Sequence, residues 1–306
     1  MVECTVEEGW HVTADGAKLY TKTWKPSGPL NAILVFIHGF SDHCNRYFDF
    51  FPNLAAHGIE VHSFDQRGWG RSVQKPSEKG NTGPTTQVLA DITSMIKSIL
   101  PSPVPLFVMG HSMGGQETLQ YAAKGPADIK KQITGFLAEA PYIRLHPAAE
   151  PNKVTVIVGK FASKLLPNKQ MVSKLDPQWM CHDPAMNKDW EADELCHDTG
   201  TLEGLSGMLD RAAELDTGKA TIGDDVQSVF IGHGTGDMCT SHEASKKFFE
   251  NLKVKDKTLK LYDGCYHCIH LEPEASKKQF TEDVAQWILE RAKPKSEEGM
   301  ETQSKL

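Results

Sequence analysis

Residues 105–114, Pro-Leu-Phe-Val-Met-Gly-His-Ser-Met-Gly, are the stretch that decides the fold of this chain. The apolar run at 105–109 predicts a buried strand, and it leads directly into Gly110-His111-Ser112-Met113-Gly114, with a helical pattern after it. A Gly-x-Ser-x-Gly pentapeptide between a strand and a helix forms a sharp, strained turn that exposes the serine hydroxyl. Glycine on both sides removes side chains that would collide with the neighbouring turn. The stretch therefore predicts a sheet covered by helices, with Ser112 as an exposed nucleophile.

The sequence on both sides of this stretch alternates short apolar runs with helical patterns, which is typical of a mostly parallel sheet. It begins with a hairpin, because two strand-like runs flank Ala14-Asp15-Gly16. The expected strands lie at 8–13, 18–24, 32–37, 60–64, 105–109, 226–231 and 258–262, and the expected helices at 46–57, 86–100, 241–252 and 274–292. The predicted fold class is α/β, with a mostly parallel central sheet and helices on both faces.

The alternation breaks between residues 141 and 221, where Pro, Asp, His and Trp become frequent and no strong strand appears. Since the same pattern resumes afterwards, we interpret 141–221 as a cap inserted into one core domain, which is formed by 1–140 and 222–292. The remaining residues, 293–306, are polar and charged and are expected to form a disordered tail.

The cap has an uneven charge. Its segment 151–175 contains five lysines, no acidic residue and several large apolar side chains, whereas 176–216 contains eleven acidic residues against one lysine and one arginine. A basic segment with a large apolar face can lie in a membrane interface, where anionic headgroups attract the lysines. Two interpretations of 151–175 stay open: peripheral contact with a membrane or lipid surface, or a cap helix packed on the core with solvated lysines.

The composition argues against some classes of function. The chain has 306 residues, with 33 Lys and Arg against 40 Asp and Glu, so a nucleic-acid partner held through phosphate contacts is not expected. The sequence contains no run of 18 apolar residues, so no membrane-spanning helix is expected. Seven scattered cysteines favour free thiols over a disulfide framework.

The sequence ends in Ser304-Lys305-Leu306, which is the peroxisomal import address when it stands at a free C-terminus. We therefore expect a peroxisomal import receptor as a partner and the peroxisome as the location. Without that import, the expected location is the cytoplasm or a lipid surface.

A serine hydroxyl is a weak nucleophile at neutral pH and needs a base that an acid orients. With this type of turn, the chain order is serine, then acid, then histidine, with the partners at strand ends. Asp237 is the preferred acid because it follows a late strand, and Glu139 is the alternative. His267 is the preferred base because it follows the last strand, and His270 is the alternative.

The tetrahedral intermediate of acyl transfer needs two N–H donors aimed at its oxyanion. One is expected from Met113, the residue after the nucleophile, and the other from Phe40, in the loop after an early buried strand. The residues expected to support the elbow and the oxyanion loop are His38, Gly39, Gly110, His111 and Gly114.

The segment Cys265-Tyr266-His267-Cys268-Ile269-His270 has a superficial likeness to a metal knuckle. A zinc site of this kind usually takes a second pair of ligands. Cys181-His182 and Cys196-His197 exist, but their spacing fits no familiar pattern. No metal and no other cofactor are expected.

Three segments and two dipeptides together resemble the fungal-type monoacylglycerol lipases of the α/β-hydrolase superfamily. They are His38-Gly39-Phe40-Ser41-Asp42-His43 with Arg46-Tyr47, the stretch Asp65-Gln66-Arg67-Gly68-Trp69-Gly70-Arg71-Ser72, the elbow 110–115, and Tyr266-His267. The resemblance covers about residues 8–292 apart from the insertion. It implies an α/β-hydrolase fold with a cap, or lid. Carried over by position, Ser112 matches the family's nucleophile, Asp237 its acid, His267 its base, and Phe40 and Met113 its oxyanion amides.

The resemblance implies a serine hydrolase that cleaves monoacylglycerols to a free fatty acid and glycerol through an acyl-enzyme. A general carboxylesterase, or a fatty-acyl ester or thioester hydrolase of the peroxisome, is the alternative. Peptidases that share the elbow and a non-catalytic binding protein also stay open, because the triad by itself does not choose the substrate.

Overall fold

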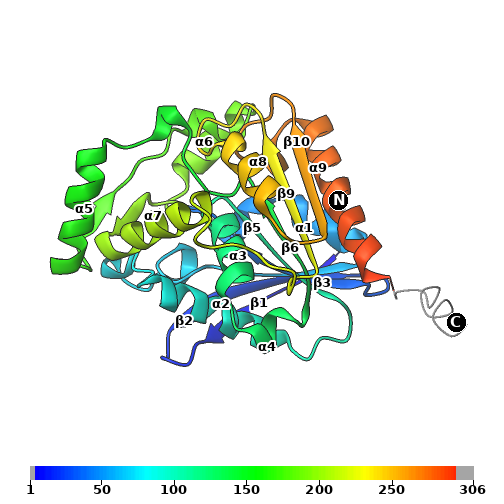
Figure 1. Ribbon diagram of the computed structural model, residues 1–306. Coiled ribbons are helices and arrows are strands. Elements are labelled where there is room, and N and C mark those ends of the chain that lie inside the picture. Colours follow the sequence, from blue (N-terminus) through cyan, green and yellow to red (C-terminus); the bar gives the residue numbers. More distant parts are fainter. Residues whose placement is uncertain (1–3, 294–306) are drawn as a thin grey trace, which may run out of the picture.

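The computed structural model describes residues 4–293 and contains an eight-stranded sheet in the order β1-β2-β4-β3-β5-β6-β9-β10 (Figure 1). The strands from β4 to β10 run parallel, and β1 and β2 add an antiparallel hairpin at one edge. The strands are β1 (Cys4–Val12), β2 (Lys18–Pro26), β3 (Ala32–Ile37), β4 (Ile59–Phe64), β5 (Leu106–His111), β6 (Ile133–Glu139), β9 (Ser228–Gly234) and β10 (Asp256–Tyr262). The predicted mostly parallel sheet is confirmed.

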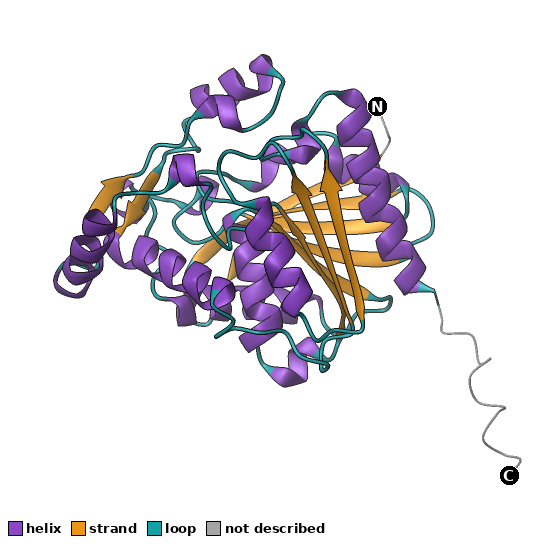
Figure 2. Cartoon of the chain, turned by 45° about the horizontal axis from the view of Figure 1, so that its top comes forward, coloured by secondary structure: helices purple, strands orange, loops and turns teal. Residues whose placement is uncertain are grey.

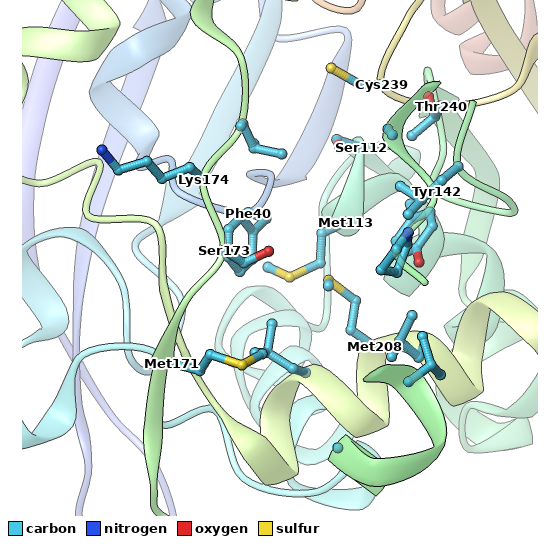
Figure 3. Close-up of a pocket in the computed structure, with 18 of the residues that line it drawn as sticks. Phe40, Ser112, Met113, Tyr142, Met171, Ser173, Lys174, Met208, Cys239 and Thr240 are labelled. Carbon is cyan, nitrogen blue, oxygen red and sulfur yellow. The ribbon is translucent and has the colours of Figure 1, made fainter. Parts of the chain in front are cut away.

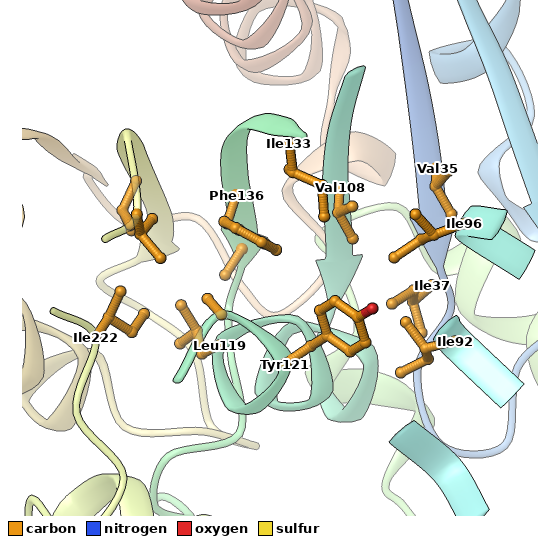
Figure 4. Close-up of a cluster of buried hydrophobic side chains, with 14 of the residues drawn as sticks. Val35, Ile37, Ile92, Ile96, Val108, Leu119, Tyr121, Ile133, Phe136 and Ile222 are labelled. Carbon is orange, nitrogen blue, oxygen red and sulfur yellow. The ribbon is translucent and has the colours of Figure 1, made fainter. Parts of the chain in front are cut away.

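Helices cover both faces of this sheet, as the sequence predicts (Figure 2). One face carries α2 (Thr85–Ile99), α3 (Met113–Lys124), α4 (Ala127–Lys130) and α8 (His242–Asn251), and the other carries α1 (Phe50–Ala56) and α9 (Glu274–Ala292). Successive residues of a strand point to opposite faces, so Val35 and Ile37 pack under α2 and α3 while Leu34 and Phe36 pack under α1 and α9. Figure 4 shows the first of these two cores. The apolar run of β3 is continuous because both of its faces are buried.

Several predicted elements differ from the structure, and β1 begins at Cys4, four residues before the strand expected at 8–13. The helix expected at 46–57 is a 3-10 turn at Cys44–Tyr47 followed by α1, with a break at Phe48, where φ is +33°. The hydroxyl of Tyr47 donates a hydrogen bond to Asp42 at 2.7 Å, which holds this turn against the core instead of letting one helix continue. The strand expected at 226–231 starts two residues later and extends to Gly234. Glycine is needed there, because an added Cβ would lie 2.5 Å from the carbonyl oxygen of Tyr266.

The cap lies between β6 and β9 and consists of short elements at one side of the sheet (Figure 1). They are α5 (Lys153–Leu165), β7 (Gln170–Val172), α6 (Pro184–Ala192), β8 (Thr199–Thr201) and α7 (Leu202–Asp216). The antiparallel pair β7–β8 was not expected from the sequence, because strands of three residues leave too short a pattern.

None of the helices within 4–293 is long and apolar enough to cross a membrane. The predicted disordered tail lies outside the described residues apart from Lys293, and so does its tripeptide Ser304-Lys305-Leu306.

Candidate active site

The turn that carries Ser112 joins the end of β5 to the start of α3. Ser112 has φ +55° and ψ −115°, a backbone conformation that L-residues rarely adopt. A Cβ added at Gly110 would lie 2.7 Å from the Thr118 hydroxyl and still closer to the backbone of Gly114. A Cβ added at Gly114 would meet the backbone at the end of β3. The two glycines therefore allow the turn to press against the neighbouring strand.

The structure brings Ser112, His267 and Asp237 together, although they lie far apart in the chain. The Ser112 hydroxyl is 2.8 Å from Nε2 of His267, and Nδ1 of His267 is 2.7 Å from Oδ2 of Asp237. Asp237 follows β9 and His267 follows β10, so both come from carboxyl ends of parallel strands. In the neutral tautomer that this arrangement requires, Nδ1–H donates to the carboxylate and Nε2 accepts from the serine hydroxyl.

The carboxylate of Asp237 is fully buried and held in its charged form. Its Oδ1 accepts hydrogen bonds from the backbone N–H groups of Cys239 and Thr240, at 2.7 and 2.9 Å, and its Oδ2 is 3.1 Å from Nε2 of His233. Burial alone would raise the pKa of Asp237, but the positive character of His267 and the bond from His233 hold this pKa well below its usual range.

The contact between Asp237 and His267 also shifts the pKa of the histidine. Burial alone would lower the pKa of His267, but the charge and the hydrogen bond of Asp237 outweigh it, and the pKa is raised. An imidazole with a raised pKa is a stronger proton acceptor, which suits a group that must take a proton from a serine hydroxyl.

The alternative acid and the alternative base pair with each other instead of with Ser112. Nδ1 of His270 lies 2.8 and 2.9 Å from the two carboxylate oxygens of Glu139, and both side chains are buried. The backbone carbonyl of Glu139 accepts from the N–H of Ser112 at 2.9 Å, so Glu139 supports the elbow through its main chain.

The loop after β3 runs beside the nucleophile and holds the second expected oxyanion donor. A Cβ added at Gly39 would lie 3.3 Å from Cβ of Ser112, so this loop passes close to the nucleophile, and Phe40 lines the same cavity as Ser112. His38 is fully buried, and its Nε2 accepts from the backbone N–H of Gln66 at 2.8 Å, which makes it a structural support of this loop.

Met113 is the first residue of α3, so its amide stands at the helix N-terminus, where negative charge is favoured. His111, on the other side of Ser112, is buried with its Nε2 3.3 Å from the backbone carbonyl of His267. Burial lowers the pKa of His111 to about 4, so this ring stays neutral and can donate to that carbonyl.

A cavity of about 410 Å³ opens beside Ser112 (Figure 3). Its walls are mostly apolar and come from the cap helices α5 and α7 as well as from the core. Figure 3 shows Phe40, Met113, Met171 and Met208 around it. The other apolar residues that line it include Leu145, Val156, Leu175, Leu202, Leu205 and Leu209. Such a space can hold a flexible hydrocarbon chain whose polar end reaches the serine.

Within 4–293, two groups of side chains have potential ligand atoms close enough to share a metal ion. One is Asp237, Cys239 and His267, which overlaps the triad. The other is His43, Asp193 and Cys196, at the contact between core and cap. There, the guanidinium of Arg46 lies 3.5 Å from Asp193, and its positive charge disfavours the binding of a metal ion at the same carboxylate.

Sequence reasoning missed the contacts between the cap and the catalytic loops. Arg46 also binds Asp189 of α6 at 2.6 Å, and the indole N–H of Trp190 donates to the backbone carbonyl of Ser41 at 3.0 Å. Backbone carbonyls of the cap accept from the loop that carries His267. The acidic run of the cap was visible in the sequence, but Arg46, the core partner of Asp189, lies 143 residues away from it in the chain.

Comparison with known proteins relates this chain to one family model and to several monoglyceride lipases. A family model described as "Serine aminopeptidase, S33" matches residues 28–274. A protein of Schizosaccharomyces pombe named "Putative monoglyceride lipase" is 38% identical over 284 residues, which cover 91% of this chain and 73% of that protein. The monoglyceride lipase of Saccharomyces cerevisiae is 30% identical over 301 residues, covering 94% and 95%. The crystal structure of a soluble variant of the Saccharomyces cerevisiae monoglyceride lipase with a substrate analogue matches with a TM-score of 0.83 at 28% identity, covering 94% and 97%.

Proposed function

This chain belongs to the serine aminopeptidase S33 family of α/β-hydrolases, and from that premise we propose that it hydrolyses monoacylglycerols to a free fatty acid and glycerol. The observation that carries the proposal is the triad at the wall of an apolar cavity of about 410 Å³. Relatives at 30% identity or more that span most of this chain are named monoglyceride lipases, which favours an ester over a peptide as the substrate.

In the proposed reaction, Oγ of Ser112 attacks the ester carbonyl while Nε2 of His267 takes the hydroxyl proton. The carbonyl oxygen becomes an oxyanion held by the N–H groups of Phe40 and Met113. His267 then gives its proton to the leaving glycerol, and an acyl-enzyme stays on Ser112. A water molecule, activated by the same histidine, attacks this ester and releases the fatty acid. Asp237 fixes the tautomer of His267 throughout.

A fluorophosphonate probe tests the nucleophile. We expect the wild-type protein to be labelled at Ser112 and the Ser112→Ala variant to stay unlabelled. Labelling that survives Ser112→Ala, or a wild-type protein that does not react, would contradict the assignment.

The substrate class is tested separately. We expect a higher kcat/KM for monoacylglycerols than for diacylglycerols, triacylglycerols and short water-soluble esters, because one chain fills the cavity and contributes burial energy of about 0.8 kcal/mol per methylene group. A preference for the short esters would instead favour a general carboxylesterase, and a preference for acyl thioesters would favour the thioester hydrolase.

We also propose that the cap docks on a lipid surface through the outer face of α5. The inner face of this helix, at Val156 and Gly159, lines the cavity. The outer face is apolar, and Phe161 and Leu165 are 71% and 80% exposed. Burial in lipid would remove this surface from water on the same helix whose inner face lines the cavity.

The structure refines which residues should test docking. Lys160 binds Asp210 of α7 at 2.5 Å, so its charge is already compensated, and the two apolar residues are the better targets. We expect Phe161→Glu with Leu165→Glu to lower binding to phosphatidylserine-containing vesicles by about tenfold or more, since each buried side chain contributes about 1.5–3 kcal/mol. Val12→Glu, at an exposed apolar residue of β1, is the matched control. Unchanged vesicle binding by the double variant would reject the docking surface.

For the location, we propose import into the peroxisome through Ser304-Lys305-Leu306. A fluorescent protein fused to the N-terminus should give punctate peroxisomal signal, and removal of the three residues should make the signal diffuse. An unchanged distribution of the fluorescence after removal of Ser304-Lys305-Leu306 would contradict the proposed targeting signal.

A further inference from the structure

A buried carboxylate lies at the end of the loop that carries the catalytic histidine. Glu272 is 2% exposed, and its Oε1 accepts from the backbone N–H of Tyr266 at 2.5 Å. Its Oε2 accepts from the backbone N–H of His182 at 3.2 Å, and Nδ1 of the His182 ring lies 2.9 Å from the same oxygen. Tyr266 directly precedes the base His267, whereas His182 belongs to the cap. One carboxylate therefore joins the base loop to the cap.

Three further contacts connect the same two segments. The N–H of Cys268 donates to the carbonyl of Met180 at 2.7 Å, and the N–H of His267 itself points to the carbonyl of Trp179 at 3.4 Å. The rings of His182 and Tyr266 are stacked with 3.8 Å between their centroids. Cap residues 179–182 thus run alongside the backbone on both sides of the catalytic imidazole.

These contacts matter because the base loop has little regular structure of its own. Between the end of β10 and the short turn Ile269–Leu271, the loop must place an imidazole 2.8 Å from Ser112. On the core side, Glu139 fixes the loop through the backbone N–H of His270 at 3.1 Å. His111 and Asp237 add core contacts to His267 itself, and on the cap side Glu272 and residues 179–182 hold the backbone that flanks it.

Burial makes the restraint at Glu272 strict. A carboxylate removed from water is costly unless N–H donors compensate it, and two of the donors named here belong to His182. Displacement of this part of the cap would leave the carboxylate short of partners. The loop would then have to rearrange, and the backbone of Tyr266 would move with it.

We propose that Glu272 and His182 are positioning residues for the catalytic base, so that His267 is correctly placed only while cap residues 179–182 are seated on its loop. This inference rests on the proposed function of Ser112, His267 and Asp237. The cap then has two parts. Residues 179–182 complete the active site, whereas the exposed helix α5 makes no hydrogen bond to the loop of His267 among the residues described.

The test uses His182→Ala, because the side chain of His182 is 45% exposed and its removal should leave the fold intact. We expect kcat to fall about tenfold to hundredfold with little change in KM, since a misplacement of about 1 Å costs about 10²-fold. His182→Asn should recover part of kcat, because its amide N–H₂ can donate to Glu272 in place of Nδ1. Glu272→Gln should behave like His182→Ala. Glu274→Gln, two residues further on and with its side chain 80% exposed, is the matched control.

A pH profile separates positioning from a general structural role. A loosened bond between His267 and Asp237 stabilises the imidazolium less, so the acid limb of kcat/KM should move to lower pH in His182→Ala and not in Glu274→Gln. The number of active sites, counted by fluorophosphonate labelling, should equal that of the wild type while the labelling rate falls.

The outcomes distinguish the two proposals. A wild-type protein that neither labels nor turns over ester would remove the proposed function itself. With an active wild type, a His182→Ala variant that keeps its kcat and acid limb and loses only thermal stability would overturn the positioning role. An increase confined to KM would also overturn it, since the contact would then shape substrate binding.

Discussion

Gly114→Ala is the change that most directly tests why the elbow has its sequence. A Cβ at Gly114 would lie 2.5 Å from the carbonyl oxygen of His38 and closer to that of Ile37, whereas ordinary contacts begin near 3.4 Å. The first of these contacts alone requires a separation of 3.4 − 2.5 = 0.9 Å. Because α3 and the loop after β3 are backbone on both sides, neither can yield through a side-chain rotation.

The displacement would separate the two proposed oxyanion donors. Phe40 follows His38 along the loop, and Met113 precedes Gly114 on α3, so the added methyl group pushes one N–H away from the other. A shift of about 1 Å at a reacting centre costs about 10²-fold, which corresponds to about 2.7 kcal/mol in the activation free energy. We therefore expect kcat of Gly114→Ala to fall about a hundredfold or more.

The assay is kcat on a monoacylglycerol, divided by the fraction of protein that a fluorophosphonate probe can titrate, together with the melting temperature. Gly28→Ala is the matched control, since a Cβ there meets nothing within 4 Å, and it should leave kcat and melting temperature unchanged. A Gly114→Ala variant with wild-type kcat per titrated site would refute the reasoning that glycine is required by the approach of β3.

Two further expectations concern buried charges. Because the neutral imidazole is the base, kcat/KM rises with pH through the pKa of His267, which Asp237 raises above its ordinary 6.5, so half-maximal activity is expected above pH 6.5. Asp237→Asn should move this limb to lower pH and reduce kcat about 10⁴-fold, and a pH–rate profile that keeps the wild-type limb would contradict the assignment. Arg211 of α7 is buried 3.0 Å from Glu117 of α3, and burial raises the pKa of Glu117 to about 7. Arg211→Met should lower the free energy of unfolding, measured with denaturant, by about 3–5 kcal/mol. The double variant Arg211→Met with Glu117→Leu should recover most of that loss. Equal stability of Arg211→Met and the double variant would show that the two side chains are not coupled.

The local backbone of the site could be predicted from sequence because short spacings express it. Gly110 and Gly114 flank Ser112 as the strained turn requires, and the apolar runs at 32–37 and 105–109 are continuous because those strands are buried on both faces. By contrast, Tyr47 interrupts the predicted helix at 46–57, since its hydroxyl binds Asp42 in a loop whose position the sequence pattern does not reveal.

The choice between the acid candidates and between the base candidates shows more sharply what the sequence alone does not determine. Glu139 and His270 were the alternatives for the triad, and the structure pairs them with each other at 2.8 Å. Strand-end position and chain order favoured Asp237 and His267, but only the spatial approach of the loops shows which carboxylate meets which ring. The outward exposure of α5 was likewise undecided, since a helix with apolar residues on two faces does not show which one the core covers.

The sequence by itself determined the fold class, the elbow and the order of the reacting residues, because each depends on neighbours within a few positions or on the periodicity of a single element. Tertiary structure alone decided how the base is held. Glu272 positions the loop of the base through its contact with His182, which lies 90 residues earlier in the chain. Neither residue lies in a local sequence pattern that predicts the other. Hydrogen-bond geometry across a packed contact depends on the path of both segments in space, and that path is set by the whole core and cap together.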